Sequence, residues 1–318
     1  MIEIRKTVND TLEILEQPEP GCWVNIVDPS EIERTWMRES LGIVPEFLQS
    51  ALDDEERSHT DFDDDTRQVL VIIDCPSVEE ESQAEDPSIV QYDTHPLSIL
   101  FLPKNDCVVT VSLKPDETLD AFCNGTVRGV STQQRTRLLL RLFLHISQRY
   151  QIYLSNIERQ FNKSERMLHQ NTTNTELKKM LGLQKSLVYF STSLKADEAT
   201  LSKINAGRLV SLYEEDRDLL EDVVIEIRQA VEMCTIYTGI LNGTMDTFGS
   251  IISNNLNVTI RTLTVIMLVL AIPTIVFSFY GMNVEGLPAI DSWIVPACIA
   301  GGGCLVAAIV FKCSKLLK

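Results

Sequence analysis

Two long uncharged runs near the C-terminus constrain this chain more than any other feature of its sequence. No charged residue occurs in 262–284, and none occurs in 292–311. Each run reaches the length of about 20 apolar residues that an α-helix needs to cross a hydrocarbon layer. The single proline in each run is compatible with a membrane helix, because neighbouring helices can satisfy the freed carbonyls. We therefore predict two membrane spans, at about 261–280 and at 293–311.

The charges that flank these runs predict their direction. Arg261 precedes the first run, and the tail 312–318 after the second carries three lysines. The connection 281–292 holds only two charged residues, and both are acidic. By the positive-inside rule, the outer flanks are cytoplasmic and the connection is external. We expect a multi-pass protein of the cell (inner) membrane, surrounded by the lipid bilayer, with cytoplasmic N- and C-termini.

The composition excludes one class of partner and favours another. The chain of 318 residues has 45 acidic and 28 basic residues and a net charge of −17. Nucleic-acid binding needs a basic face, so we expect no nucleic-acid partner. An acidic protein instead attracts cations. Divalent cations are the partners that this balance suits.

Neither cysteines nor histidines point to enzyme chemistry. The eight cysteines form no Cys-x-x-Cys pair, and we interpret them as reduced, small apolar side chains. The four histidines look isolated, and the sequence contains no phosphate-binding loop or nucleophile–base motif. We predict that the protein is not an enzyme and needs no cofactor.

The residues before the hairpin divide into three predicted regions. Residues 1–130 contain short apolar runs such as WVNIV and QVLVIID, which predict the strands of an α/β domain. A helix is expected to open at Asp28-Pro29-Ser30-Glu31, with Asp28 as its cap, and the acidic stretches 53–65 and 79–86 are expected to be solvated loops. A helical hairpin region follows at 131–210. Residues 211–280 then predict one stalk helix that continues into the first span; a continuous helix of more than about 60 residues is longer than roughly 90 Å at 1.5 Å per residue.

The expected fold class is therefore an α+β cytoplasmic domain, a long α-helical stalk and a two-helix C-terminal membrane hairpin. A helix of that length needs partners along it, so we expect self-association. Steps of 3.6 residues from Asp246 trace a row of polar or small side chains, the polar stripe, which reaches Ser278. Such a stripe favours an aqueous path, although close packing through small residues remains an alternative. The pore-lining candidates are Asn257, Thr264, Met267, Leu268, Ala271, Thr274 and Ser278, of which Met267 and Leu268 would form an apolar constriction.

The external loop begins with Gly281-Met282-Asn283, followed by Glu285. Magnesium loses its coordinated waters reluctantly, so a ring of Asn283 amide oxygens could hydrogen-bond those waters instead of replacing them. Glu285 would raise the local cation concentration. We expect these four residues to form a selectivity filter.

Taken together, these segments resemble the CorA family of magnesium transporters. The likeness rests on Tyr-Gly-Met-Asn at the end of the first span, and on WVNIVDP, LGIVPEFL, DDEERSHTDFDDDT and LGLQKSLVYFSTSLKAD. The resemblance implies a homopentamer with a CorA-like funnel, pore-lining by the first membrane helix, and uptake of Mg²⁺, with Co²⁺ or Ni²⁺ tolerated. Mg²⁺ would then be both substrate and regulatory ligand, closing the channel from the cytoplasm.

The resemblance also implies a set of regulatory acids. Asp222 and Asp246 match stalk positions that carry acids in the family, but the partner position on the neighbouring domain is Ser50. Asp53 and Asp54, or Glu55 and Glu56 beside them, are the candidates to substitute for it. The loop also has Leu287-Pro288-Ala289-Ile290 where the family often has Met-Pro-Glu-Leu.

Two alternatives stay open at this point. The first is a zinc transporter of the same superfamily, like the ZntB branch, although the polar stripe contains no histidine or cysteine, the ligands that zinc prefers. The second is a membrane-anchored signalling or scaffold protein that transports nothing.

Overall fold

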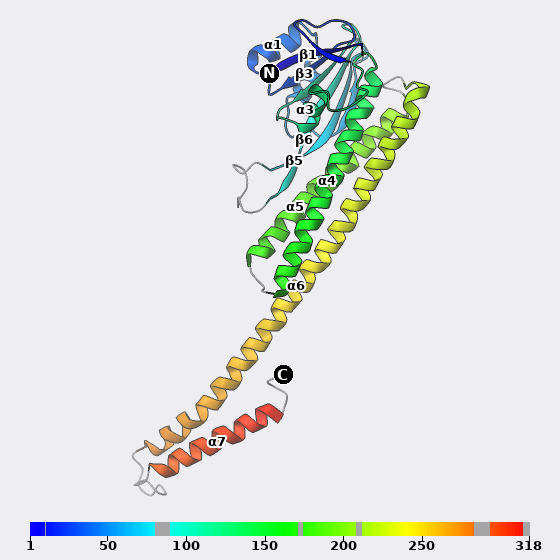
Figure 1. Cartoon of the computed structure of the whole chain (residues 1–318). Coiled ribbons are helices and arrows are strands. Elements are labelled where there is room, and N and C mark those ends of the chain that lie inside the picture. The colour runs from blue at the N-terminus through cyan, green and yellow to red at the C-terminus, as the bar shows by residue number, and fades with distance from the viewer. Residues whose placement is uncertain (10, 80–89, 171–173, 208–211, 283–292, 314–318) are drawn as a thin grey trace. The chain divides into compact units, whose positions relative to one another are not determined.

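The computed structural model describes residues 1–318 except 10, 80–89, 171–173, 208–211, 283–292 and 314–318. The described chain divides into two compact units, Met1–Asn242 and Gly243–Lys318 (Figure 1). One helix, α6 (Arg217–Tyr280), contributes residues to both.

A seven-stranded mixed sheet forms the centre of the first unit. Its order is β2-β1-β3-β7-β6-β5-β4, and β3 and β7 are its only parallel neighbours among the described strands. The strands are β1 (Ile2–Val8), β2 (Thr11–Leu15), β3 (Trp23–Val27), β4 (His59–Phe62), β5 (Val69–Val78), β6 (Tyr92–Leu102) and β7 (Cys107–Ser112). The central strands β5, β6 and β7 are buried on both faces, which explains their nearly continuous apolar sequences.

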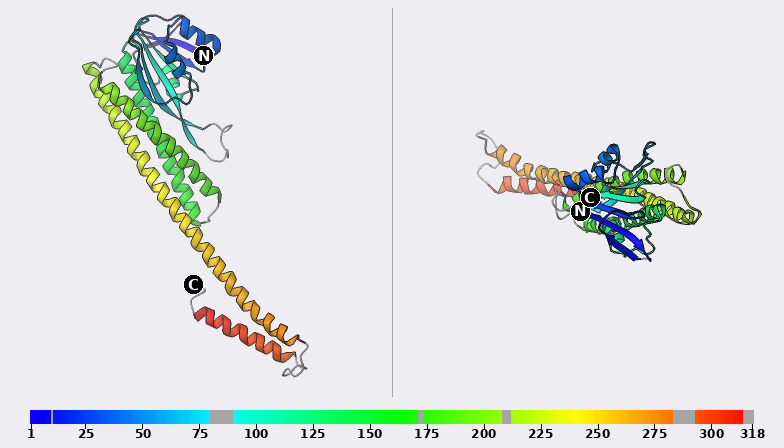
Figure 2. Two further views of the ribbon diagram at one scale, coloured as in Figure 1. Left: turned by 180° about the vertical axis from the view of Figure 1, so that it is seen from behind. Right: turned by 90° about the horizontal axis from the view of Figure 1, so that it is seen from above.

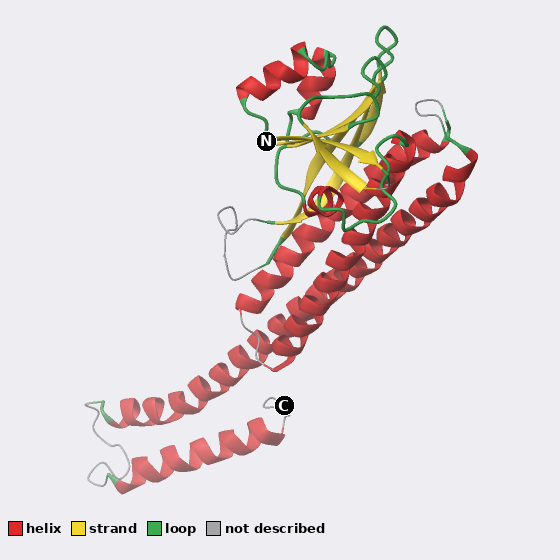
Figure 3. Cartoon of the chain, turned by 45° about the horizontal axis from the view of Figure 1, so that its top comes forward, coloured by secondary structure: helices red, strands yellow, loops and turns green. Residues whose placement is uncertain are grey.

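Helices cover both faces of this sheet (Figure 3). On one face, Val24 and Ile26 of β3 share a core with α1 (Glu31–Glu39) and α2 (Pro45–Ala51). Side chains alternate along a strand, so Asn25 points to the other face, where its amide nitrogen lies 3.5 Å from Cys123 Sγ in α3 (Glu117–Cys123). The two long helices α4 (Arg135–Gln170) and α5 (Asn174–Asn205) contact β5 and β6.

The start of α1 differs from the sequence prediction. Asp28 was expected to be the cap, but the N-cap is Ser30, whose hydroxyl accepts a hydrogen bond from the Glu33 backbone N–H. The Glu33 carboxylate in turn accepts one from the Ser30 backbone N–H at 2.8 Å, which completes a capping box. Asp28 instead has φ 44, a left-handed conformation that Asp tolerates better than most residues.

The prediction that 53–65 is entirely loop is also wrong. His59–Phe62 within it form the edge strand β4, which pairs with β5. The N-terminal strands β1 and β2 and the short helix α3 were not predicted at all.

Three long helices complete the first unit. They are α4 (Arg135–Gln170), α5 (Asn174–Asn205) and the first part of α6, preceded by a 3₁₀ turn at Glu214–Asp216. Figure 2 shows α4 and α5 side by side, and they are in contact. The buried residues of α6 in this unit are Leu220, Val223, Ile227, Ala230, Cys234 and Leu241. Their alternating spacing of three and four places them on one face of the helix.

The second unit consists of the remainder of α6 and helix α7 (Ile294–Cys313). Val265 of α6 and Ala300 of α7 are its most buried apolar residues in the spans. The helices approach closely at Gly303, where an added Cβ would lie 2.8 Å from Ile272 Cγ2. Small residues permit this kind of close approach between membrane helices. Both helices are long and apolar enough to cross a membrane.

The same contact supplies a partner for a carbonyl that Pro273 leaves free. Proline has no backbone N–H, so Pro273 cannot bond to the carbonyl of Val269 four residues earlier. The thiol of Cys304 in α7 takes the role of the missing N–H, with its Sγ 3.5 Å from the Val269 oxygen. One residue further on, the Thr274 hydroxyl donates to the Leu270 carbonyl at 3.1 Å. α6 therefore continues through its proline.

We predict that Gly303→Ala destabilises the protein, because Ile272 is β-branched and cannot readily move its Cγ2 aside. The expected loss is about 1–2 kcal/mol, typical of overpacking. Gly301→Ala and Gly302→Ala are matched controls, since a Cβ there meets no atom within 4 Å in the described part of the chain. Thermal melting in detergent measures the effect. Equal melting temperatures for all three variants would contradict the close contact.

Candidate ion path and metal-binding residues

The pore-lining candidates of α6 are accessible in the chain. Asn257, Thr264, Thr274 and Ser278 are exposed, and Ala271 is half-buried. The two apolar members, Met267 and Leu268, remain 55% and 51% exposed. Apolar side chains this exposed need a covering layer of lipid or of other protein.

This open face is distinct from the face that packs on α7. Val265, Val269 and Ile272 lie toward α7, as the burial of Val265 and the contacts of Cys304 and Gly303 indicate. At 100° per residue, the mean direction of the pore-lining candidates is roughly 130° from that of these residues. The contact with α7 therefore leaves the polar stripe uncovered.

The hydroxyl groups on this face are already oriented. Thr264 Oγ1 donates to the Ile260 carbonyl at 2.8 Å, and Thr274 Oγ1 donates to the Leu270 carbonyl. Each oxygen keeps lone pairs that can accept a further hydrogen bond. These hydroxyl oxygens can therefore accept hydrogen bonds from the water molecules around a hydrated cation.

The predicted filter falls partly outside the described residues. α6 ends at Tyr280, and Gly281 donates its backbone N–H to the Phe277 carbonyl at 2.9 Å. A Cβ on Gly281 would lie 3.2 Å from that same oxygen, so glycine suits this close turn. Met282 is 53% exposed. Asn283 and Glu285 lie outside the described residues.

The predicted regulatory acids are solvent-accessible and separate. Asp222 and Asp246 are exposed on α6, and Asp53 and Asp54 are exposed after α2. Asp53 accepts a hydrogen bond from the Glu55 backbone N–H at 3.0 Å, while Ser50 in α2 is half-buried. Within the described part of a single chain, none of these four acids belongs to a group of three potential metal ligands.

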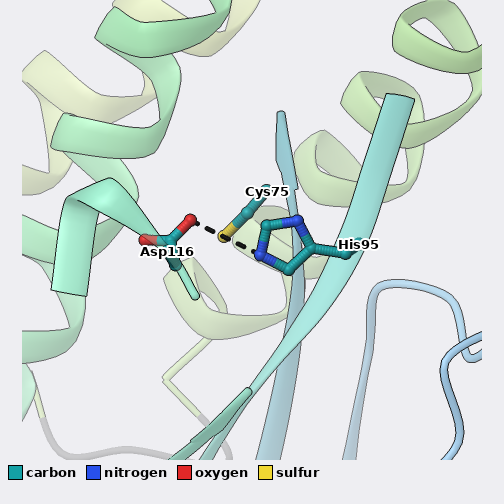
Figure 4. A group of neighbouring side chains, drawn as sticks. All are labelled: Cys75, His95 and Asp116. Carbon is teal, nitrogen blue, oxygen red and sulfur yellow. Dashed lines mark ion pairs between the residues drawn. The ribbon is translucent and has the colours of Figure 1, made fainter. Parts of the chain in front are cut away.

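One such group does occur, at a place that the sequence analysis missed. Cys75 of β5, His95 of β6 and Asp116 before α3 converge, with one potential ligand atom of each within 4.8 Å of the others (Figure 4). His95 was interpreted as isolated, which is wrong: it lies directly opposite Cys75 in the strand pair. Both residues lie in strands that pair with each other, but the register of that pairing across the acidic hairpin could not be read from the sequence alone.

Burial sets the electrostatics of this cluster. Burial raises the pKa of the Cys75 thiol well above its usual value. Burial also acts to raise the pKa of Asp116, but the nearby His95 imidazole and a hydrogen bond from the Leu119 backbone N–H outweigh it and hold that pKa low. The carboxylate is thus ionised beside a neutral thiol.

Comparison with known proteins places these features in a family. The family described as "CorA-like Mg2+ transporter protein" matches residues 19–313. The "Cobalt/magnesium transport protein CorA" of Methanocaldococcus jannaschii is 26% identical over 288 residues, which cover 86% of this chain and 85% of that protein. The protein of the same description from Thermotoga maritima is 23% identical over 305 residues, covering 93% of this chain and 83% of its own length.

Solved structures support the fold. The complete CorA magnesium transporter structure from Methanocaldococcus jannaschii matches with a TM-score of 0.80 and 22% identity, covering 98% of this chain and 97% of that one. The ZntB cytoplasmic domain from Vibrio parahaemolyticus matches with a TM-score of 0.60 and 14% identity, covering 80% and 97%. The expected fold class, an α+β domain followed by a long helix and a two-helix hairpin, is confirmed. Because the family match extends over nearly the entire sequence, this chain belongs to the CorA-like Mg²⁺ transporter proteins.

Proposed function

We propose that the protein is a homopentameric, channel-type transporter of Mg²⁺ that also accepts Co²⁺ or Ni²⁺. It lies in the inner membrane with both termini in the cytoplasm, and the membrane potential drives uptake. One elementary charge gains about 2.3 kcal/mol per 100 mV, so a dication gains roughly twice that without ATP. The transport names of the relatives support the ion class.

The observation that carries this proposal is the uncovered face of α6. A helix apolar enough to span a membrane leaves its small and hydroxyl-bearing side chains open, while a different face packs on α7. Polar groups facing lipid would be unfavourable, so this face calls for an aqueous path between copies of the chain. Met267 and Leu268 would form the narrow apolar gate of that path.

The filter would act on the hydrated ion. In the proposed pentamer, five copies of Asn283 surround the external mouth just beyond Met282, and their amide oxygens accept hydrogen bonds from ion-bound water. Glu285 nearby concentrates dications at the mouth. Neutral oxygens that do not displace water suit an ion that dehydrates reluctantly.

Closure would depend on cytoplasmic Mg²⁺ between neighbouring subunits. Exposed carboxylates that face each other across an interface repel, and a dication offsets that repulsion. Asp222 and Asp246, with Asp53 or Asp54 in place of an acid at Ser50, are the residues we propose for this role. Their exposure in the single chain leaves them available to a neighbour.

Zinc is the second candidate ion, favoured by the fold match to the ZntB cytoplasmic domain. The polar stripe offers oxygen ligands, with no cysteine or histidine between Asp246 and Ser278. Zinc prefers nitrogen and sulfur. Flux assays with both ions decide between them.

We expect Asn283→Ala to abolish Mg²⁺ flux into proteoliposomes at an imposed potential, while the pentamer still assembles. The matched control is Asn255→Ala, because Asn255 lies about 160° around α6 from the pore-lining candidate Asn257. Normal flux in Asn283→Ala would remove the proposed filter. Running Mg²⁺, Co²⁺, Ni²⁺ and Zn²⁺ in parallel ranks the ions.

A second test compares two threonines that differ only in the face they occupy. Thr262 and Thr264 both donate to the carbonyl four residues earlier, at 2.9 and 2.8 Å, but they point about 160° apart. Thr264→Leu should block flux by narrowing the path, and Thr262→Leu should leave it near the wild-type rate. Equal flux in the two variants would contradict pore-lining by this face, and would favour a scaffold role if Asn283→Ala also transports normally.

The third test concerns closure. Replacing Asp222 and Asp246 together by asparagine should raise the internal Mg²⁺ concentration needed for half-inhibition by about tenfold, because the interface then lacks the carboxylates that attract and hold the closing ion. Asp218→Asn is the control, as Asp218 is an exposed acid in the first turn of the same helix. Inhibition curves that coincide with the wild type would place the sensor elsewhere.

A further inference from the structure

The Cys75–His95–Asp116 cluster has no role in the transport proposed above, and it lies in the first unit among residues closed to solvent. Cys75 is 0% exposed, His95 5% and Asp116 3%. Its three side chains come from β5, β6 and the residue before α3, and they point toward one another (Figure 4).

The Nε2 atom of His95 is the atom whose lack of a hydrogen bond a ligand would explain. Neither ring nitrogen of His95 has a hydrogen-bond partner among the described residues. Its Nε2 lies 3.5 Å from Asp116 Oδ2, within ion-pair range but without hydrogen-bond geometry. Buried polar atoms in native proteins are nearly always hydrogen-bonded, so an imidazole nitrogen whose one polar contact is a long ion pair, beside a thiol, leaves room for a ligand between the three groups.

The carboxylate is held in the orientation that a metal ligand needs. Asp116 caps α3, and its Oδ1 accepts the Leu119 backbone N–H at 2.9 Å. That bond fixes the group and leaves Oδ2 directed at His95. Ordered partners of this kind orient the ligands of metal sites. The strand pairing does the same for the other two residues, because Cys75 and His95 face each other across one register position.

The spacing suits a small tetrahedral ion. Two ligands at the usual zinc–nitrogen and zinc–oxygen distances stand about 3.4 Å apart at a tetrahedral centre. The separation of Nε2 and Oδ2 is 3.5 Å, and the sulfur lies within 4.8 Å of both. A modest movement of the Cys75 side chain would complete three ligands.

We propose that Cys75, His95 and Asp116 bind a borderline-soft divalent ion, Zn²⁺ or Co²⁺, that ties β5 and β6 to the start of α3. A sulfur, nitrogen and oxygen donor set selects these ions over Mg²⁺, which requires oxygen ligands in octahedral geometry. The ion displaces the thiol proton, and the thiolate and carboxylate together neutralise its charge. A cysteine nucleophile is excluded, because no substrate reaches a fully buried thiol.

The charged surroundings are mixed. Arg149 acts on both Asp116 and Cys75 as a positive neighbour, while Asp74 and Asp197 act on Cys75 as negative ones. The Arg149 guanidinium is already engaged by Glu117 at 2.6 Å and by the Tyr153 hydroxyl. Its charge is therefore partly compensated before an ion enters.

The test uses the full-length protein expressed with Co²⁺ in the medium, since a site this buried takes up its ion as the chain folds. The protein is purified in detergent, washed with EDTA and then with excess Mg²⁺. Metal content and the near-ultraviolet absorption are then measured. We expect close to one retained Co²⁺ per chain and a sulfur-to-cobalt charge-transfer band. Ions in an oxygen-lined path give no such band and are removed by the wash.

Variants locate the site. Cys75→Ser should lose the band, and His95→Gln should retain at least tenfold less metal. Cys234→Ser is the matched control, because Cys234 is an equally buried thiol that donates to the Leu187 carbonyl on other helices. Absence of the band in the wild type, which needs no variant to fold, overturns the proposal. So does its persistence in Cys75→Ser.

Discussion

The packing of α6 on α7 determines what the rest of the second unit presents to its surroundings. The close approach of Gly303 to Ile272 and the Cys304 contact with the Val269 carbonyl fix the rotation of α6 in the turn that precedes its proline. Once that face packs on α7, the face with the hydroxyl groups points away from α7 and stays exposed. A proline that would otherwise expose a carbonyl to hydrocarbon thus becomes part of the contact that orients the helix.

The two groups of candidate residues suit two kinds of cation chemistry. Along α6 the candidates offer oxygen atoms and small side chains, suited to an ion that keeps its water. Inside the α/β domain, sulfur and imidazole stand beside one carboxylate, a set suited to ions that exchange water for softer ligands. Magnesium in cellular excess would not compete for the second set, so a cell could tune the two independently.

Sequence reasoning succeeded where one residue type carries the signal by itself. Two uncharged runs were enough for the hairpin, whereas pore-lining by the small and polar residues from Asn257 to Ser278 stays a prediction. It failed where several weak signals compete. Ser30 and Asp28 are both good caps, and each has a glutamate three residues later, Glu33 and Glu31, so the sequence pattern does not choose between them. β1 and β2 carry charged residues among their apolar ones, and β2 is the edge strand with β1 beside it, so few of their residues are fully buried. The cluster around His95 depends on strand register, which a long acidic hairpin leaves undetermined.

The spacing of the open face has a geometric consequence for any assembly built on it. Asn257, Thr264, Ala271 and Ser278 recur every seven residues, whereas two turns of an α-helix contain slightly more than seven. A row with this period drifts by about 20° per repeat, or roughly 60° over its three repeats. If the α6 helices of several copies were straight and parallel, part of this row would point away from their shared axis. Helices that keep all four residues on that axis must wind around it with a left-handed twist, so any unwinding would rotate one end of the row out of line before the other.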